Sequence, residues 1–233
     1  MGTLYLVRHG QASAFDDNYD RLSTLGEQQA RLLGEEWRRR GIELHRVFTG
    51  PRVRQQRTAE IAGDAGGLPA PVVVPELDEM GVEPLFREHL PDIFARHPHL
   101  SALGDALLAA DGDGERARGF ARLFEAVLQL WIRGEVNASG VESWLEFRGR
   151  VRRGLAIVRA EGRGRRIAVF TSAGPVAAAV QLALGADDDT ALSMAFRVRN
   201  SSFSQFLFSG NRFSLASFNE TPHLADAALV TVR

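Results

Sequence analysis

The sequence predicts an α/β protein with a helical insertion in its middle, and three observations support this. Near both ends of the chain, short apolar runs end in polar loops that lead into segments of helical periodicity. Between about residues 84 and 159 the periodicity is helical throughout. The 233 residues, 45% hydrophobic and 24% charged, have ordinary globular composition, so we expect a single domain over 1–233.

The first half of the chain contains three predicted strands and two predicted helices. The first strand, at 3–7, is apolar and runs into a polar loop. Thr24-Leu25-Gly26-Glu27 matches a capping box, and the helix that it starts is closed by Gly41. The remaining elements are a strand at 46–49, a helix at 52–65, a strand at 72–74 and an acidic turn at 76–79.

The insertion, at about 84–159, shows its helical pattern most clearly around residues 120–132. One apolar face there is formed by Phe120, Leu123, Phe124, Val127, Leu128, Trp131 and Ile132. We expect this insertion to cover another part of the molecule.

After the insertion, an apolar strand at 166–171 leads into Ser172-Ala173-Gly174 and an Ala-rich helix that ends at Leu184. The last two strands, at 202–209 and 212–219, are separated by two turn residues, which predicts a hairpin.

The composition excludes several kinds of chemistry. The chain has no cysteine, which rules out disulfides, thiolate metal sites, redox pairs and a cysteine nucleophile. All 28 basic residues are arginine, so P-loop and Schiff-base chemistry, which need lysine, are also excluded. A net charge of −1 gives no reason to expect a nucleic acid or membrane partner. The first residues lack the pattern of a secretory signal, and we expect a cytoplasmic protein.

Polar residues follow four predicted strands, each at the point where the strand ends. Ligands of α/β sheets gather at such strand ends, and the helix starts there favour anions. The junctions carry Arg8 and His9, then Arg54, then Glu79, and finally the helix start after Ser172. We interpret them as a phosphate site in which neutral His9 attacks phosphorus, Arg8 and Arg54 hold the oxygens, and Glu79 protonates the leaving oxygen. This chemistry requires no metal.

The same residues resemble the motifs of a known family. Arg8-His9-Gly10 is followed, in order, by a Pro-x-x-Arg-x-x-x-Thr-Ala segment and a Leu-x-Glu element that ends at Glu79; the middle segment is carried by Pro51, Arg54, Thr58 and Ala59. This pattern resembles the histidine phosphatase superfamily, which includes cofactor-dependent phosphoglycerate mutases and many small-molecule phosphatases. The resemblance spans nearly the whole chain.

The resemblance implies a three-layer α/β/α fold, with a mixed, mainly parallel sheet and a helical insertion over the active site. It also implies hydrolysis of a small phosphorylated substrate through a phosphohistidine on His9, with no cofactor and no metal. The catalytic residues would be His9, Arg8, Arg54 and Glu79, and the substrate-binding residues Gln11, Ser172 and Ala173. It specifies no oligomeric state.

Two positions depart from the family pattern and keep other functions open. Ser172 stands where the family has a second catalytic histidine, and its neutral hydroxyl predicts slow turnover. This favours one alternative, a catalytically degenerate protein that binds a phosphorylated ligand. Phe15 stands near an asparagine of the mutases, which argues against the other alternative, a phosphomutase. His223 could replace the missing histidine, although a structural contact in the tail is the expectation.

Overall fold

The computed structural model describes residues 1–12 and 20–232 and divides the chain into two compact units. The first unit comprises Met1–Glu79 and Arg148–Arg233, and the second comprises Met80–Phe147. Phe15, which informed the expectation about mutase activity, lies outside the described residues. No helix in the described ranges is long and apolar enough to cross a membrane.

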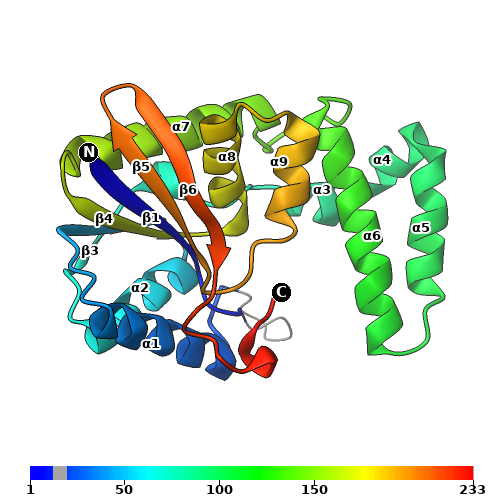
Figure 1. Ribbon diagram of the computed structural model, residues 1–233. Helices are drawn as coiled ribbons and strands as arrows, with labels where there is room; N and C mark the ends of the chain where they lie inside the picture. Colours follow the sequence, from blue (N-terminus) through cyan, green and yellow to red (C-terminus); the bar gives the residue numbers. More distant parts are fainter. Residues whose placement is uncertain (13–19, 233) are drawn as a thin grey trace. The chain divides into compact units, whose positions relative to one another are not determined.

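The first unit is built on a six-stranded sheet with the order β3-β2-β4-β1-β5-β6 (Figure 1). Strands β1, β2, β3 and β4 are parallel to one another, whereas β5 is antiparallel to both β1 and β6. The strands are β1 (Gly2–Arg8), β2 (Arg46–Thr49), β3 (Pro71–Val73), β4 (Arg166–Thr171), β5 (Phe203–Ser209) and β6 (Arg212–Glu220). The expected mixed, mainly parallel sheet is confirmed.

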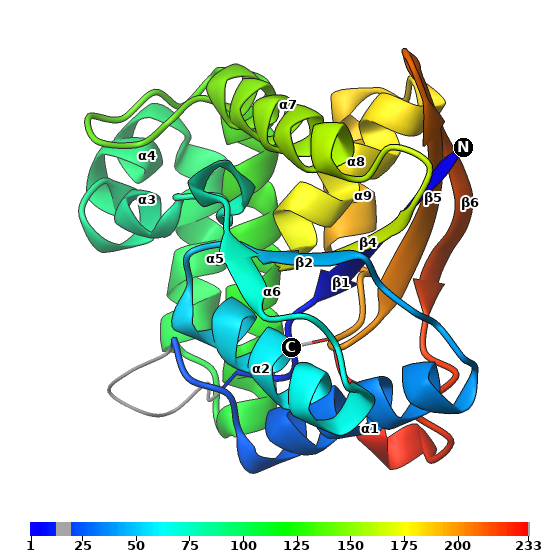
Figure 2. The same cartoon turned by 90° about the vertical axis from the view of Figure 1, so that its left-hand side faces the viewer.

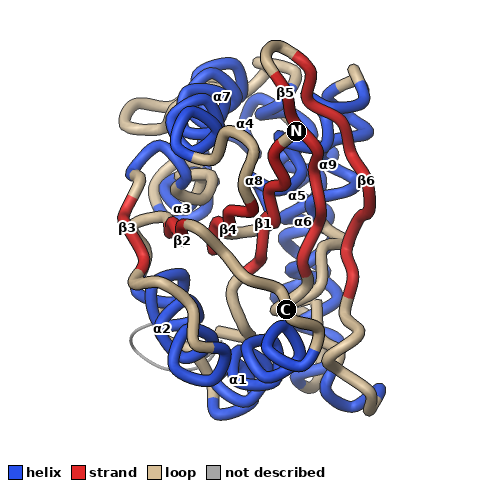
Figure 3. Tube along the Cα trace, turned by 60° about the vertical axis from the view of Figure 1, so that its left-hand side comes forward, coloured by secondary structure: helices blue, strands red, loops and turns tan. Residues whose placement is uncertain are grey.

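Helices cover both faces of this sheet, as Figures 2 and 3 show, which confirms the α/β/α layering. Helices α1 (Thr24–Arg39) and α2 (Val53–Gly66) lie on one face. The part of α7 (Trp144–Glu161) that belongs to this unit and α8 (Ala173–Leu184) lie on the other. Three further short elements are η1 (Pro75–Leu77), α9 (Asp188–Ala195) and η2 (Ala227–Leu229).

A hydrophobic core fills the space between the sheet and the α1–α2 layer. Alternate strand residues such as Tyr5 and Val7 point to this face, as the two-residue period of a strand requires. Trp37 of α1 is fully buried, and its ring lies 5.5 Å from Tyr5 and 5.8 Å from Phe203 between centroids. Truncation of such a tryptophan typically costs about 3–5 kcal/mol, so this cluster anchors α1 to the sheet.

The second unit is helical and has its own core. It contains α3 (Glu83–Arg87), α4 (Leu90–Arg96), α5 (Pro98–Leu108), α6 (Asp113–Ile132) and the first turn of α7. Trp131 lies 5.5 Å from Trp144 between ring centroids and donates to the carbonyl of Glu142. The insertion was expected at about 84–159, and its position over the active site stays a prediction.

Several predicted boundaries are wrong by one or two residues. The N-cap of α1 is Ser23, which accepts a hydrogen bond from the Gly26 N–H, whereas the capping box predicted Thr24. Both residue types cap helices well, so the sequence pattern alone does not separate them. In the insertion, Phe120 of the predicted apolar face is 47% exposed. The sequence pattern did not predict α9 or η2.

Candidate active site

The strand register brings three of the predicted junctions to one edge of the sheet. Arg8 at the end of β1 pairs with Thr171 at the end of β4, and Thr49 at the end of β2 pairs with Phe170. The residues that follow β1 and β2 extend this pairing. The His9 N–H donates to the Thr171 carbonyl at 2.8 Å, and the Gly50 N–H donates to the Phe170 carbonyl at 2.9 Å. The polar residues that follow β1, β2 and β4 therefore start from neighbouring points.

Close backbone packing fixes the loop after His9. A Cβ on Gly10 would lie 2.3 Å from the carbonyl oxygen of Gly26, so no other residue fits without movement. The Gly10 N–H donates to the Thr58 hydroxyl at 3.1 Å, and that hydroxyl donates to the Arg54 carbonyl at 2.7 Å. Thr58 of the family motif thus ties the loop to the helix that carries Arg54.

His9 is buried, and its two ring nitrogens have different partners. Nδ1 lies 2.7 Å from the carbonyl of Gly10, and Nε2 lies 3.1 Å from Nε of Arg54. Because a carbonyl only accepts and a guanidinium only donates, Nδ1 carries the proton and Nε2 carries the lone pair. The nitrogen available as a nucleophile is therefore Nε2.

The surroundings of His9 keep its imidazole neutral. Burial, the Arg54 guanidinium and then the Arg8 guanidinium hold its pKa well below the ordinary value of 6.5, against a smaller opposing effect of the Gly10 carbonyl. A neutral imidazole is the form that can attack phosphorus.

Arg54 is itself buried and lies between His9 and an acidic residue. Its NH1 is 3.2 Å from Oδ1 of Asp20, whose Oδ2 accepts a hydrogen bond from the Val53 N–H at 2.9 Å. Asp20 thus occupies the start of α2, where the free N–H groups of a helix attract anions. Asp20 was not among the residues selected from the sequence, because it belongs to none of the motifs.

Arg8 has a different set of contacts. Its NH1 donates to the carbonyls of Val198 and Val232, the latter at 2.6 Å. These two bonds join the end of β1 to the segment before β5 and to the C-terminal tail. The structure therefore places Arg8 beside His9, whose pKa it lowers, and also gives it a role in holding the tail.

Glu79 is joined to the start of α8. Its Oε1 accepts a hydrogen bond from the Gly174 N–H at 3.1 Å, and its own N–H donates to Oδ1 of Asp78 at 2.7 Å. That Asp78 oxygen also accepts from Nε of Arg52 at 2.7 Å. The Gly174 N–H, at the helix start that was expected to favour an anion, is thus bonded to the Glu79 carboxylate.

Ser172 is fully buried, with its hydroxyl 2.8 Å from Nε2 of Gln55, which donates to it. Its side chain makes no capping bond to α8, although it stands at the N-cap position, and Ala173 begins the helix. Contact between this hydroxyl and a substrate oxygen would need a local movement that exposes it. Gln55 immediately follows Arg54 in the motif, but no spacing rule pairs it with a residue 117 positions away.

The two remaining candidates, Gln11 and His223, are bonded to residues other than His9, Arg54 and Glu79. The Gln11 N–H donates to Oε1 of Gln29 at 2.9 Å, and the Gln11 side chain accepts from the Ser23 hydroxyl at 2.9 Å, next to the start of α1. His223 is buried, and its Nε2 lies 3.0 Å from the Ser201 hydroxyl. Because that hydroxyl donates to the Gln29 carbonyl, His223 donates to it and has a structural contact in the tail.

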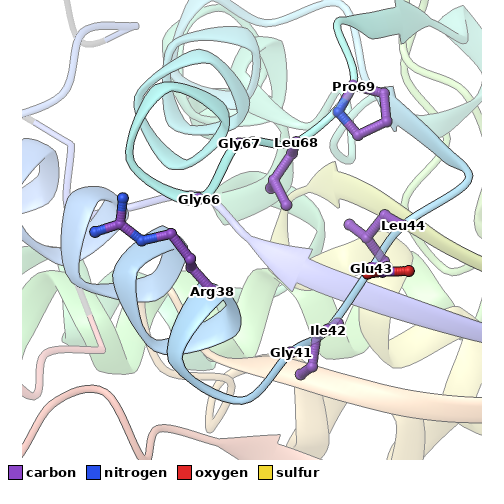
Figure 4. Close-up of a pocket in the computed structure, with 9 residues that line it drawn as sticks. All are labelled: Arg38, Gly41, Ile42, Glu43, Leu44, Gly66, Gly67, Leu68 and Pro69. Carbon is purple, nitrogen blue, oxygen red and sulfur yellow. The ribbon is translucent and has the colours of Figure 1, made fainter.

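A pocket of about 550 Å³ lies at the other ends of α1 and α2 (Figure 4). Its lining includes Arg38 in the last turn of α1, Ile42 after α1 and Leu68 after α2. Gly66, the last residue of α2, also lines the pocket, and it lies twelve residues after Arg54, so about 18 Å of helix separate this pocket from Arg54. It is separate from the His9 cluster.

The cluster of His9, Arg54, Glu79 and their partners can be compared with known proteins. The family model of the histidine phosphatase superfamily (branch 1) matches residues 4–134 and 113–221. The chain belongs to the histidine phosphatase superfamily. This confirms the resemblance carried by Arg8-His9-Gly10 and the two later motifs.

Relatives of this superfamily member include phosphatases and a mutase. This chain is 33% identical to the Phosphohistidine phosphatase SixA of Escherichia coli K12 over 81 residues, which are 34% of this chain. The match spans only half of the length of that relative. A phosphoglycerate mutase from Bacillus anthracis shares its fold with a TM-score of 0.66 and 16% identity over 96% of this chain and 95% of that one.

Two solved phosphatases share the fold as well. The mycobacterial glucosyl-3-phosphoglycerate phosphatase, in complex with inorganic phosphate, gives a TM-score of 0.63 at 20% identity over 96% of this chain and 99% of that one. The alpha-ribazole phosphatase of Shigella flexneri gives 0.61 at 20% identity over 94% and 96%. At these identities the likeness shows the fold alone.

Proposed function

We propose that this protein is a phosphatase that hydrolyses a phosphate monoester of a small molecule through a phosphohistidine on His9. The observation that carries the proposal is the arrangement of the His9 ring. The Gly10 carbonyl fixes the proton on Nδ1, which leaves the Nε2 lone pair directed at the guanidinium of Arg54. A buried neutral imidazole beside a buried cation suits attack on an anionic phosphoryl group.

The first step transfers the phosphoryl group to the protein. The Nε2 lone pair forms a bond to phosphorus while the bond from phosphorus to the leaving oxygen breaks. That oxygen takes its proton from the Glu79 carboxyl, and Arg54, with Arg8 beside it, stabilises charge on the remaining oxygens.

The second step releases phosphate. Water attacks phosphorus, its proton passes to the Glu79 carboxylate, and the electrons of the phosphorus–nitrogen bond return to Nε2 of His9. The nucleophile and the acid are regenerated, and the products are the alcohol and inorganic phosphate.

A second candidate, a protein that binds a phosphorylated ligand without turnover, is favoured by Ser172. A histidine there would add a cationic donor, whereas Ser172 is neutral and buried against Gln55. Loss of one preorganised donor typically lowers a rate by about 10²- to 10³-fold, so the phosphatase is expected to be slow.

The balance of products released from a simple ester separates the candidates. With p-nitrophenyl phosphate in excess of enzyme, a phosphatase releases a burst of nitrophenol and then equal amounts of nitrophenol and phosphate. A binding protein releases neither. A phosphomutase retains the phosphoryl group and passes it to an added monophosphate, with dependence on a bisphosphate primer. Retention of the phosphoryl group without phosphate release, or release of neither nitrophenol nor phosphate, contradicts the proposal.

A further inference from the structure

The segment that carries Glu79 is held from one side by an arginine of α7. Arg150 donates from NH1 to the carbonyls of Glu76 and Asp78, both at 3.0 Å, and from NH2 to the carbonyl of Glu79 at 3.1 Å. A single guanidinium therefore satisfies three backbone acceptors of a four-residue stretch. The carbonyls of such a loop would otherwise have to bond to water.

The same segment is held from the other side through Asp78. Oδ1 of Asp78 accepts from Nε of Arg52 and from the Glu79 N–H, both at 2.7 Å. Glu79 is thus fixed at its N–H by Asp78, at its carbonyl by Arg150, and at its carboxylate by the Gly174 N–H. With three bonds on one residue, the carboxylate has little freedom to rotate.

Close packing of α7 brings Arg150 within reach. A Cβ on Gly154 would lie 2.8 Å from Cγ and Cδ2 of Leu77, so only a glycine lets the helix approach η1 this closely. Gly154 lies four residues after Arg150, and residues at this spacing share one face of a helix. The face of α7 that packs on Leu77 therefore also carries Arg150, which lies against residues 76–79.

We infer that Arg150 is a positioning residue for Glu79, which it holds where the carboxyl group can protonate the leaving oxygen. This inference rests on the proposed function, in which Glu79 is the acid. It also assigns a reason for arginine at this position, since the planar fork of a guanidinium reaches several acceptors in fixed directions and an ammonium does not.

The test uses two aryl esters that differ in how much the leaving oxygen needs a proton. Nitrophenolate leaves from p-nitrophenyl phosphate largely without protonation, whereas the more basic oxygen of phenyl phosphate needs an acid. Loss of general acid catalysis typically lowers a rate by about 10²- to 10⁴-fold. We expect kcat/KM of Arg150→Ala, which reports the first step, to fall about tenfold or more on phenyl phosphate and less than about threefold on p-nitrophenyl phosphate.

Two further variants are measured beside it. Glu79→Gln removes the acid and is expected to show the same dependence on the leaving group, only larger. Arg148→Ala is the matched control, because Arg148 lies on the same helix and pairs with Asp188 at 2.6 Å instead of with the loop. Arg148→Ala is expected to change kcat/KM for the two esters by the same factor. Amide exchange of residues 76–79 is expected to accelerate in Arg150→Ala and not in Arg148→Ala.

The outcomes separate this inference from the proposed function. Equal losses on both esters in Arg150→Ala, with unchanged amide exchange, overturn the role of Arg150 while the phosphatase stands. If Glu79→Gln shows no dependence on the leaving group, the acid assignment fails and the inference with it. If the wild-type protein hydrolyses neither ester, the proposed function fails, and amide exchange alone decides whether Arg150 holds the loop. Should Arg150→Ala not fold, Arg150→Lys is expected to show the same trend with a smaller loss.

Discussion

Nε of Arg54 lies 3.1 Å from Nε2 of His9 and donates to the lone pair that would attack phosphorus. The bond has two effects on the resting protein. It contributes to the lowered pKa of His9, and it occupies the nucleophile until an anion arrives. A phosphoryl oxygen that accepts from Arg54 would release Nε2 and stand beside it at the same time.

Replacement of Arg54 tests this relationship. Arg54→Ala is expected to weaken inhibition by phosphate or vanadate about tenfold or more, because one charge-assisted hydrogen bond contributes about 1.5–3 kcal/mol. The pKa of His9, followed by NMR, is expected to rise but to stay below 6.5, since its burial remains. Arg57→Ala, at an exposed arginine one turn further along α2, is the control. Unchanged inhibition in folded Arg54→Ala would show that the anion site lies elsewhere.

Asp20 is expected to oppose anion binding. Its carboxylate accepts from the Val53 N–H and lies 3.2 Å from NH1 of Arg54, so a bound phosphate meets a negative charge at the start of α2. Asp20→Asn keeps an acceptor for the N–H and removes the charge. Phosphate is expected to bind about threefold to tenfold more tightly to this variant, as expected for a partly exposed charge.

Isothermal titration with phosphate measures the effect of Asp20→Asn. Glu60→Gln, which alters an exposed partner of Arg57 on the same helix, controls for a general change of charge. Weaker binding to Asp20→Asn would mean that Asp20 chiefly orients Arg54 for the ligand.

Ser172 is expected to matter first for stability. In Ser172→Ala, the buried Nε2 of Gln55 loses its hydroxyl acceptor, which typically costs about 1–3 kcal/mol. Chemical unfolding measures this loss, and turnover per folded molecule is measured on the same samples. Turnover that falls tenfold or more with unchanged stability would instead assign the Ser172 hydroxyl to the phosphate.

His223 makes the fold sensitive to acid. Burial is the main cause that lowers its pKa to about 4 in the folded protein, with Glu36 opposing and Arg40 assisting. In the unfolded chain His223 binds a proton near pH 6.5, whereas in the folded chain it stays neutral down to about pH 4. The free energy of unfolding therefore falls as the pH drops below 6.5. For His223 the loss approaches about 3 kcal/mol near pH 4, and the lowered pKa of His9 acts in the same direction.

Urea unfolding between pH 4.5 and 7 measures this dependence. His223→Gln, whose amide can still donate to the Ser201 hydroxyl, is expected to lose less stability over the range than the wild-type protein. Identical slopes in the two proteins would show that other groups set the acid sensitivity.

Local patterns predicted most of the sheet and its helices. The strand at 166–171 was predicted from four consecutive apolar residues, Ile167–Phe170, and every residue after Arg166 is buried, because a central parallel strand is covered on both faces. Helix α9 was missed, since it has only eight residues and its acidic N-cap region reads as a polar turn. The cap of α1 was predicted at Thr24 instead of Ser23, because both residue types cap helices and a local pattern does not separate them.

The candidate site was predictable where the motifs carry it. His9 and Arg54 were selected from separate motifs, and the structure places them in hydrogen-bond contact. Other contacts join residues more than 70 positions apart. Gln55 donates a hydrogen bond to Ser172, and Arg150 donates to the carbonyls of the segment that carries Glu79. Such contacts depend on how helices pack and on which rotamers fit, and no sequence spacing encodes them.

The central claim is that Nε2 of His9 receives the phosphoryl group, and its most direct test is to locate that group. The protein is mixed with a reactive phosphate ester, quenched in base, and examined by mass spectrometry and NMR. We expect an acid-labile, base-stable phosphate on Nε2 of His9, absent from His9→Ala, whose hydrolysis should fall by several orders of magnitude. A phosphate on Nδ1 or on another residue, or full hydrolysis by His9→Ala, would contradict the account.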